Sequence, residues 1–302
     1  MVVIGQGFGD PRGFGESSSS RTYETERAPA SSGTSSYFLH DQLTKLLLVV
    51  GFTALGLIIV LTRRFRLRTV LLVASVAGLG FAIGGVLCPM SAVQNVILKA
   101  STGYLLLFLI PTVIAFFFGR LFCGYVCPFG ALQELLHIRT LRARIPERAL
   151  RWLRLLPYAL LAYLVVRVLV TGILTLDGMT PFKALFTFGG TPVALAVSAA
   201  FVVASVFVFR PFCTLLCPLG AWLSLISRIG PFRMRSRDAC VHCRRCDAVC
   251  GAQAIHSGAV DRSQCLLCGE CIRACPVDAL CFAHTRKDRA DVERTSPEGP
   301  AD

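Results

Sequence analysis

The chain has 302 residues, of which 54% are hydrophobic and only 16% are charged, and its formal net charge is +13. Its mean hydropathy is +0.63. This composition excludes an ordinary soluble domain, in which about a quarter of the residues are charged. It predicts an α-helical polytopic membrane protein. No grouping of nucleophile, base and orienting residue is visible in the sequence, so hydrolytic and transferase chemistry has no support.

The N-terminal segment 1–36 is rich in glycine and serine, as in ESSSSR and PASSGTSS. Such a composition cannot bury enough apolar surface to fold, so we expect a disordered tail. The segment contains no apolar run of the kind that a cleaved secretory signal requires.

Five apolar runs, each near the length that crosses a bilayer, follow the tail and predict transmembrane helices. They lie at Leu43–Thr62, Thr69–Leu87, Tyr104–Phe118, Leu155–Leu176 and Pro192–Phe209. The fourth run contains Arg167, which we expect to face protein or water and not lipid. Residues 37–230 therefore form a predicted transmembrane domain. Buried helices of a large soluble core are the alternative, but arginine-rich loops between the runs argue against it.

Arginine is concentrated in alternate loops. The first arginine-rich segment is Arg63–Arg68, between the first two runs. The second lies between the third and fourth runs and contains Arg120, Arg139, Arg142, Arg144, Arg148, Arg151 and Arg154. The third follows the fifth run and contains Arg210, Arg228, Arg233, Arg235 and Arg237. The loops 88–103 and 177–191 carry one basic residue each, Lys99 and Lys183. Because arginine-rich loops stay in the cytoplasm, we expect the N-terminus outside and the C-terminal region inside, in a bacterial inner membrane. Membrane lipid is thus an expected partner, whereas nucleic acid is not, because the basic charge follows the topology.

The transmembrane domain contains an internal repeat with an offset of 90 residues, FCGYVCPFGALQE and FCTLLCPLGAW. Cysteines four apart share one face of a helix, and the proline after each pair suits a helix break or a new helix start. We therefore expect the two pairs to converge on one redox or metal site at the cytoplasmic membrane edge. These cysteines, the transmembrane set, are Cys123, Cys127, Cys213 and Cys217.

The chemistry of the transmembrane set stays open at this point. Four thiolates could hold a further iron–sulfur cluster, bind copper or cycle as dithiols. They could instead pack as small hydrophobic residues, which is also the reading for the isolated Cys88. Haem b is not expected, since it needs axial histidines on spans and none of the five lies in one: His40, His137, His242, His256 and His284.

The C-terminal third carries Cys-x2-Cys-x2-Cys-x3-Cys twice, with an offset of 25 residues. This spacing is typical of two [4Fe–4S] clusters, in which the fourth cysteine of each run ligates the other cluster. The first set is therefore Cys240, Cys243, Cys246 and Cys275, and the second set is Cys265, Cys268, Cys271 and Cys250. Zinc is the alternative, but the cysteines are too dense for two zinc sites of ordinary spacing.

Residues 231–284 are thus a predicted α+β ferredoxin domain of the bacterial two-cluster type, and 285–302 a polar disordered tail. The second run ends in Cys275–Pro276, whereas the first ends in Cys250–Gly251. This departure affects local rigidity and not ligation. We expect Cys281 to pack as a small hydrophobic residue and His242 to be a solvated loop residue.

The combination of spans, two Cys-x3-Cys-Pro motifs and paired ferredoxin motifs resembles the membrane-bound polyferredoxins, the NapH-, NosR- and CcoG-like proteins, over residues 68–282. The resemblance implies transfer of single electrons between a quinone or cytoplasmic donor and a partner redox protein, as a component of a quinol-linked oxidoreductase. It also implies that the three cysteine sets are the functional residues. Copper reduction or metal handling in metalloenzyme assembly is one alternative, and a redox-sensing regulator is another.

Overall fold

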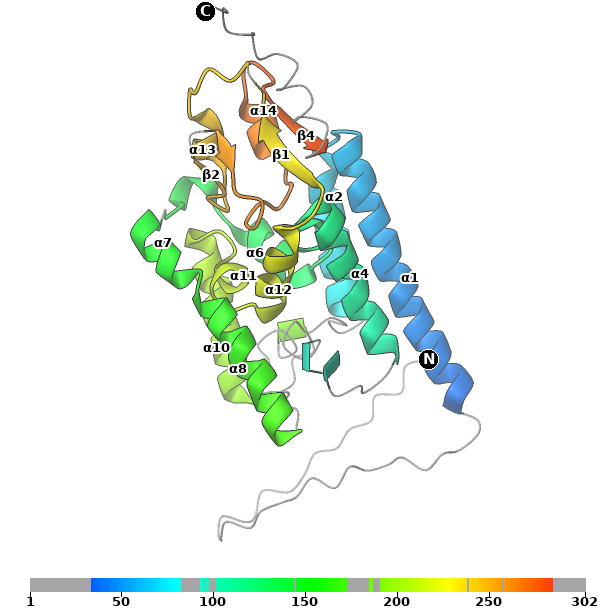
Figure 1. The fold of residues 1–302 in the computed structure, drawn as a ribbon. Coiled ribbons are helices and arrows are strands. Elements are labelled where there is room, and N and C mark those ends of the chain that lie inside the picture. Colours follow the sequence, from blue (N-terminus) through cyan, green and yellow to red (C-terminus); the bar gives the residue numbers. More distant parts are fainter. Residues whose placement is uncertain are drawn as a thin grey trace, which may run out of the picture.

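The computed structural model describes residues 34–82, 93–94, 96–97, 102–143, 145–172, 185–186, 191–237, 239–256 and 258–284. Within these residues the chain forms a helical bundle with a small α+β domain seated on one end (Figure 1). The described residues are mostly helical, as expected, and the predicted domain boundaries stay predictions. Cys88, the tail 285–302 and most of the segment 1–36 lie outside the described residues.

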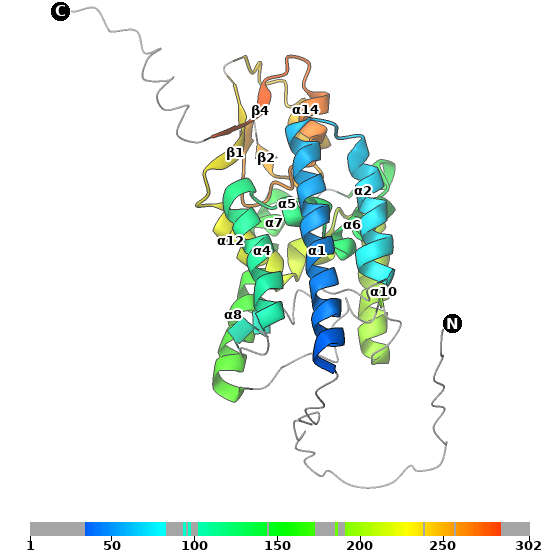
Figure 2. The same cartoon turned by 90° about the vertical axis from the view of Figure 1, so that its right-hand side faces the viewer.

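Each of the five apolar runs contains a helix, and these helices run side by side in the bundle (Figure 2). The first helix begins inside the segment that its composition assigns to the tail. The helices are α1 (Thr34–Leu61), α2 (Leu67–Ser75) continued by the π-helix η1 (Val76–Ala82), α4 (Thr102–Phe118), α8 (Leu156–Thr171) and α10 (Pro192–Phe207).

Two stretches, Thr44–Leu61 and Arg148–Thr171, are long and apolar enough to cross a membrane. The second combines α8 with α7 (Glu147–Leu153), which follows the short helix η2 (Arg139–Leu141). The helices of the other three runs are apolar but shorter within the described residues. Length therefore supports two spans, and the five-span count stays a prediction.

The outer surfaces of these helices are apolar. Large hydrophobic side chains are exposed on α1, α2 and α8, with exposed fractions of 61% for Leu47, 66% for Val70 and 78% for Val170. Such a surface suits lipid better than water. Arg167, which we expected to face protein or water, is exposed about one turn before α8 ends. From there its long side chain can reach the headgroup region.

Each Cys-x3-Cys-Pro motif bends the chain from one short helix into the next. Cys127 and Cys217 are N-caps with extended backbone, and proline takes the first turn of the helix that follows. The expectation that each pair lies on one continuous helix is therefore wrong, while the expected helix start at proline is confirmed. The helices are α5 (Leu121–Tyr125) and α6 (Pro128–Leu136) in the first motif, and α11 (Pro211–Leu215) and α12 (Pro218–Ser227) in the second.

The α+β domain joins its two ends in one strand pair. β1 (Phe232–Ser236) is antiparallel to β4 (Leu280–His284), and Phe232 pairs with His284. Cys281, in β4, is buried, as expected of a packing residue. The domain also contains the strand pair β2 (Ile255–His256) and β3 (Ala259–Val260) and the helices α13 (Arg245–Val249) and α14 (Glu270–Ala274).

The two cysteine runs of this domain fold into the same backbone path. Residues with positive φ recur at the 25-residue offset of the sequence repeat, a conformation that non-glycine residues rarely adopt. The pairs are His242 and Leu267 (50° and 55°), Arg244 and Gly269 (56° and 77°), and Gln253 and Asp278 (48° and 46°).

An aromatic stack fixes the strand pair to the helical bundle. The ring of Phe118, at the end of α4, stacks on Phe232 and Phe282 with centroid separations of 5.7 and 6.2 Å. Phe232 and Phe282 stack on each other at 5.8 Å. Each such pair contributes about 0.5–1.5 kcal/mol beyond the area it buries.

Arginines also hold the two domains together by donating to backbone carbonyls. The rigid fork of a guanidinium presents several N–H donors at once, so one side chain can satisfy carbonyls on two or three residues. Arg142 donates to Ala248, Cys250 and Gly251, Arg154 to Ala252 and Gln253, Arg120 to Ser263, and Arg262 to Gly230 and Phe116.

Three of the arginines that we counted as exposed loop charges are buried. The exposed fractions are 5% for Arg68, 5% for Arg120 and 1% for Arg210. In the folded protein they are therefore not surface charges, whereas Arg63 and Arg148 are exposed.

The domains approach each other closely at Gly124. A Cβ atom added there would lie 2.2 Å from the carbonyl oxygen of Leu266. The hydroxyl group of the next residue, Tyr125, donates to the carbonyl oxygen of Leu267 at 2.9 Å. Any side chain at position 124 must therefore displace the ferredoxin domain.

The substitution Gly124→Ala is expected to lower the free energy of unfolding by about 1–3 kcal/mol, because the methyl group overpacks a backbone contact. Thermal melting of the purified protein followed by circular dichroism measures the loss. Gly51→Ala in α1 is the matched control, since a Cβ atom there meets nothing within 4 Å. Equal melting temperatures for the two variants would contradict the contact.

Candidate functional site

The first set of cysteines lines a single cavity. Cys240, Cys243, Cys246 and Cys275 face it together with His242. Cys243 is exposed and the other three are partly buried, so this cavity lies near the surface. His242 is exposed, as expected. The structure thus brings together the four residues that we assigned to one cluster, including the fourth from the other run, and their role as ligands stays a prediction.

The second set lies deeper. Cys250 and Cys271 are buried. Burial raises the pKa of the Cys265 thiol to about 12, and Cys268 and Cys250 are close enough to contribute to the rise. Burial also raises the pKa of the Cys271 thiol, and the nearby Cys265, Cys268 and Cys250 add to the rise. The four thiols are therefore neighbours, and binding iron as thiolates would release their protons.

The loops of both runs have a backbone suited to a cluster. Arg244 and Gly269, the N-caps of α13 and α14, are left-handed. Successive N–H groups around a left-handed residue form a concavity that binds anions, including iron–sulfur clusters. The two cysteine sets and the two equivalent loops together fit a pair of clusters.

The missing proline of the first run has a structural reason. A Cβ atom added to Gly251 would lie 2.8 Å from the ring of Phe209, at the end of the α10 segment. Arg142 also donates to the carbonyl oxygens of Cys250 and Gly251. Glycine is therefore required for the packing of the two domains, and Arg142 supplies the rigidity that proline supplies at position 276.

The transmembrane set also converges, although its residues come from two halves of the chain. Burial, followed by Cys127 and Cys123, raises the pKa of the Cys213 thiol to about 12. Burial, followed by Cys213, Cys123 and Cys127, also raises the pKa of Cys217. All four have free thiols. The predicted convergence of the two pairs is therefore seen, and what they bind stays a prediction.

Two arginines cross between the halves of the repeat. Arg120 and Arg210 each stand three residues before the first cysteine of a motif. A guanidinium nitrogen of Arg210 donates to the carbonyl oxygen of Cys123 and would lie 2.8 Å from a Cβ atom on Gly130. The guanidinium of Arg120 would lie 3.0 Å from a Cβ atom on Gly220. The glycine of each motif thus leaves room for the arginine of the other.

Arg120 is placed among the thiols themselves. It lies near Cys123, Cys213 and Cys217, and the Cys123 thiol is within hydrogen-bonding reach. The guanidinium also donates to Gln264 of the ferredoxin domain at 3.2 Å. Arg120 therefore supplies a buried positive charge beside the transmembrane set and links that set to the ferredoxin domain.

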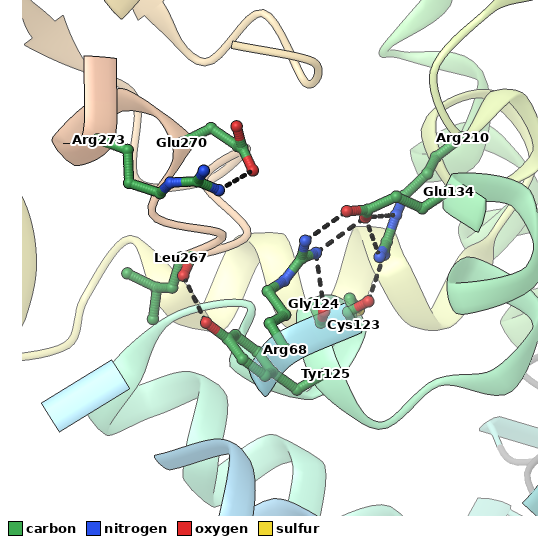
Figure 3. A network of polar contacts seen from close by, with 9 residues as sticks. All are labelled: Arg68, Cys123, Gly124, Tyr125, Glu134, Arg210, Leu267, Glu270 and Arg273. Atoms are coloured by element: carbon green, nitrogen blue, oxygen red, sulfur yellow. Dashed lines mark hydrogen bonds and ion pairs between the residues drawn. The ribbon is translucent and has the colours of Figure 1, made fainter. Parts of the chain in front are cut away.

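A partly buried carboxylate joins the other two buried arginines (Figure 3). Glu134 accepts from Arg210 at 2.6 Å and from Arg68 at 2.8 Å. Burial alone would raise the pKa of Glu134, but Arg210 and Arg68 lower it to about 2. The carboxylate is therefore ionised, and three buried arginines against one carboxylate leave a net charge of +2.

Two family models, both described as a 4Fe-4S binding domain, match the chain. One matches residues 100–146 and 191–237, and the other matches residues 259–280. An uncharacterized protein of Methanocaldococcus jannaschii, MJ0750, is 32% identical over 212 residues, which cover 68% of this chain and 89% of that relative. The chain belongs to the membrane-bound polyferredoxin family.

Two named relatives agree with this membership. The polyferredoxin is 32% identical to the regulatory protein NosR of Pseudomonas aeruginosa over 51% of this chain and 23% of NosR. It is 26% identical to the ferredoxin-type protein NapH of Escherichia coli over 53% of this chain and 61% of NapH. No solved structure matches the chain. The polyferredoxin is accordingly an iron–sulfur electron-transfer protein.

Within the described part of the polyferredoxin, no group of three His, Cys, Asp or Glu side chains is arranged around a single metal ion. In a cubane each thiolate ligates a different iron, so the sulfur atoms stand farther apart than around one zinc ion.

Sequence reasoning missed the buried charges and the contact glycine. Arg120 and Arg210 share the 90-residue offset of the cysteine motifs, so the repeat itself was a signal for them. Glu134 has no counterpart in the second motif, where Ser224 stands. No sequence pattern near Gly124 indicated its role, because the residue that it contacts, Leu266, is distant in the sequence.

The substitution Cys275→Ser tests the crossed assignment. It is expected to remove about one of the two ferredoxin-type clusters, since a cubane needs all four thiolates for stable binding. Iron analysis and electron paramagnetic resonance of the anaerobically purified protein measure this loss.

The variant to compare is Cys246→Ser, which should remove the same signal because Cys246 belongs to the same set. Cys271→Ser should remove the other signal. A Cys275→Ser spectrum that matches Cys271→Ser would show that each run holds its own cluster and that the crossing is absent.

Proposed function

We propose that the polyferredoxin passes single electrons between a quinone or cytoplasmic donor and a partner redox protein. When bound, the clusters supply the one-electron chemistry. The first set would hold a cluster near the surface, and the second set would hold one next to the transmembrane domain. The transmembrane set would hold a third group at the membrane edge.

The observation that carries the proposal is the contact between two cysteine loops. Gly124, between Cys123 and Cys127, lies against Leu266, which is between Cys265 and Cys268. The hydrogen bond from Tyr125 to Leu267 fixes the same contact. Two thiol sites on loops in direct contact support a relay between the ferredoxin domain and the transmembrane domain.

Charge and family both support a cluster at the transmembrane set. A cubane with four thiolates carries a net charge of about −2, and uncompensated charge in a buried site is costly. The charges of Arg68, Arg120, Arg210 and Glu134 sum to +2. The family model described as a 4Fe-4S binding domain spans both motifs. A third cluster therefore fits better than copper or packed thiols.

A cavity of about 720 Å³ supports the quinone as a partner. It lies between α2, α6 and the ferredoxin domain, a size that suits a small ligand. Its lining combines two aromatic rings, a histidine and a cysteine of the second set with charged side chains. These residues are Phe65, Phe209, His137 and Cys268, with Arg66, Arg68, Arg142, Arg273, Glu134 and Glu270. A ring placed there would lie within contact of that set.

The proposed topology has five spans, with the N-terminus outside and the ferredoxin domain in the cytoplasm. The basic segments after α1 and before α8 lie at the end of the bundle that carries the ferredoxin domain (Figure 1). Arginine-rich ends stay in the cytoplasm, where thiols also stay reduced.

Replacing the four cysteines of the transmembrane set by serine tests the relay. We expect the iron content to fall by about four atoms, one cubane, and electron transfer from a quinol analogue to the ferredoxin domain to stop. Both are measured on the full-length protein after its membrane insertion and its two ferredoxin-type clusters are verified. Unchanged transfer with unchanged metal would show that these cysteines only pack, and copper in the parent protein would favour metal handling.

The substitution Arg120→Gln is expected to lower the midpoint potential of the transmembrane site, because a buried positive charge stabilises the added electron. A shift of about 60 mV corresponds to a tenfold change in a one-electron equilibrium. Redox titration followed by electron paramagnetic resonance measures it.

Arg120→Lys keeps the charge and should restore most of the potential. The exposed Arg167→Gln is the control and should change nothing. A potential that is the same in Arg120→Gln and the parent protein would remove the arginine from the charge balance.

A further inference from the structure

A second cavity, of about 380 Å³, lies outside the thiol sites. It is formed where α7 and the start of α8 meet the end of α12 and the ferredoxin domain. Three guanidinium groups and one carboxylate line it, with a histidine, so the site is a basic concavity. These residues are Arg151, Arg154, Arg228, Asp261 and His256.

The donors around this cavity are not all used inside the protein. Arg154 donates through one terminal nitrogen to Ala252 and Gln253, both at 3.0 Å. Its Nε is buried and has no hydrogen-bond partner within the described residues. The carboxylate of Asp261 accepts from the N–H and the hydroxyl of Ser263 at 2.9 and 2.7 Å. Arg154 is therefore used mainly inside the protein, and Arg151 and Arg228 are the lining residues whose cationic donors an acceptor from outside could reach.

Exposed apolar side chains follow directly in sequence the arginines that line the cavity, at the end of a membrane-length helix. The stretch Arg148–Thr171 begins here. Trp152 is 74% exposed, Ile229 is 73% exposed and Leu155 is 54% exposed. Tryptophan is enriched where a span leaves the bilayer. Basic donors inside and apolar side chains outside match a molecule with an anionic head and hydrocarbon chains.

We propose that this cavity binds the phosphodiester headgroup of an anionic phospholipid. Guanidinium groups bind phosphate oxygens in bidentate fashion, and basic pockets at the cytoplasmic ends of spans recognise anionic headgroups. A soluble phosphate compound would bind the same arginines, but it has no hydrocarbon chains to contact the exposed side chains of Trp152 and Ile229.

The bound headgroup would connect the two domains. Arg151 and Arg228 come from the membrane helices, whereas His256 and Asp261 belong to the ferredoxin domain. A lipid in this cavity would therefore hold the ferredoxin domain on the membrane surface. This inference depends on membrane insertion and is independent of the relay through the transmembrane set.

The test uses the full-length protein in detergent and native mass spectrometry with dioleoylphosphatidylglycerol or dioleoylphosphatidylcholine. We expect selective retention of phosphatidylglycerol. The double variant Arg151→Gln with Arg228→Gln should lose about tenfold or more of that affinity, since each arginine at the surface contributes strongly to anionic lipid binding. Arg154 is left in place because it holds backbone carbonyls of the ferredoxin domain.

Arg148→Gln is the matched control, since Arg148 is exposed on the same helix and does not line the cavity. The corresponding lysine double variant should keep the selectivity. Equal retention of both lipids, or a double variant that binds like the control, would overturn the proposal. Inorganic phosphate binding as tightly as the lipid would also overturn it, by showing an anion site without a lipid. The single variants replace the double variant if its iron–sulfur absorbance shows that it is misfolded.

Discussion

The structure depends on a close backbone contact between two loops that are far apart in the sequence. Gly124 lies against Leu266 with no room for a side chain. Around this contact, arginines from the helical domain donate to carbonyls of the ferredoxin domain. A buried carbonyl without a partner costs free energy, so these donors make the close approach stable. The contact and its arginines are what place the ferredoxin domain beside the thiols of the transmembrane set.

The internal repeat explains why the transmembrane site needs both halves. Arg210 contacts the first motif, and Arg120 contacts the glycine of the second. Each arginine lies near cysteines of both motifs, so the two halves share the positive charge around the set. The symmetry ends at Glu134, because its counterpart Ser224 bonds to Tyr158 instead. Glu134 holds Arg68 and Arg210 on the side of the bundle that faces the second set, so the asymmetry coincides with the place where the ferredoxin domain docks.

Much of this arrangement could be predicted from the sequence, because cysteine spacing and apolar length are local signals. The crossed sets, the α+β domain and the helix start at each proline follow from such signals. The break between Cys123 and Cys127 could not, since spacing of four residues is equally compatible with one helix. Composition also cannot tell a buried arginine such as Arg210 from an exposed one such as Arg148, because burial depends on partners supplied by distant segments. Gly251 is a similar case, explained only by the ring of Phe209.

The arginines of the chain have two separate roles, which the net charge of +13 does not distinguish. Exposed arginines such as Arg63 and Arg148 mark the end of the bundle that carries the ferredoxin domain. Buried arginines act on the thiol sites, whose exposure decreases from Cys243 at the surface to Cys250 and Cys217 in the interior. Added negative charge is increasingly unfavourable along this path, because burial removes the water that would stabilise it. Arg120 and Arg210 lie at its deepest point, where a fixed positive charge has the largest effect. Their placement therefore favours added negative charge in the interior, which the proposed electron relay would require.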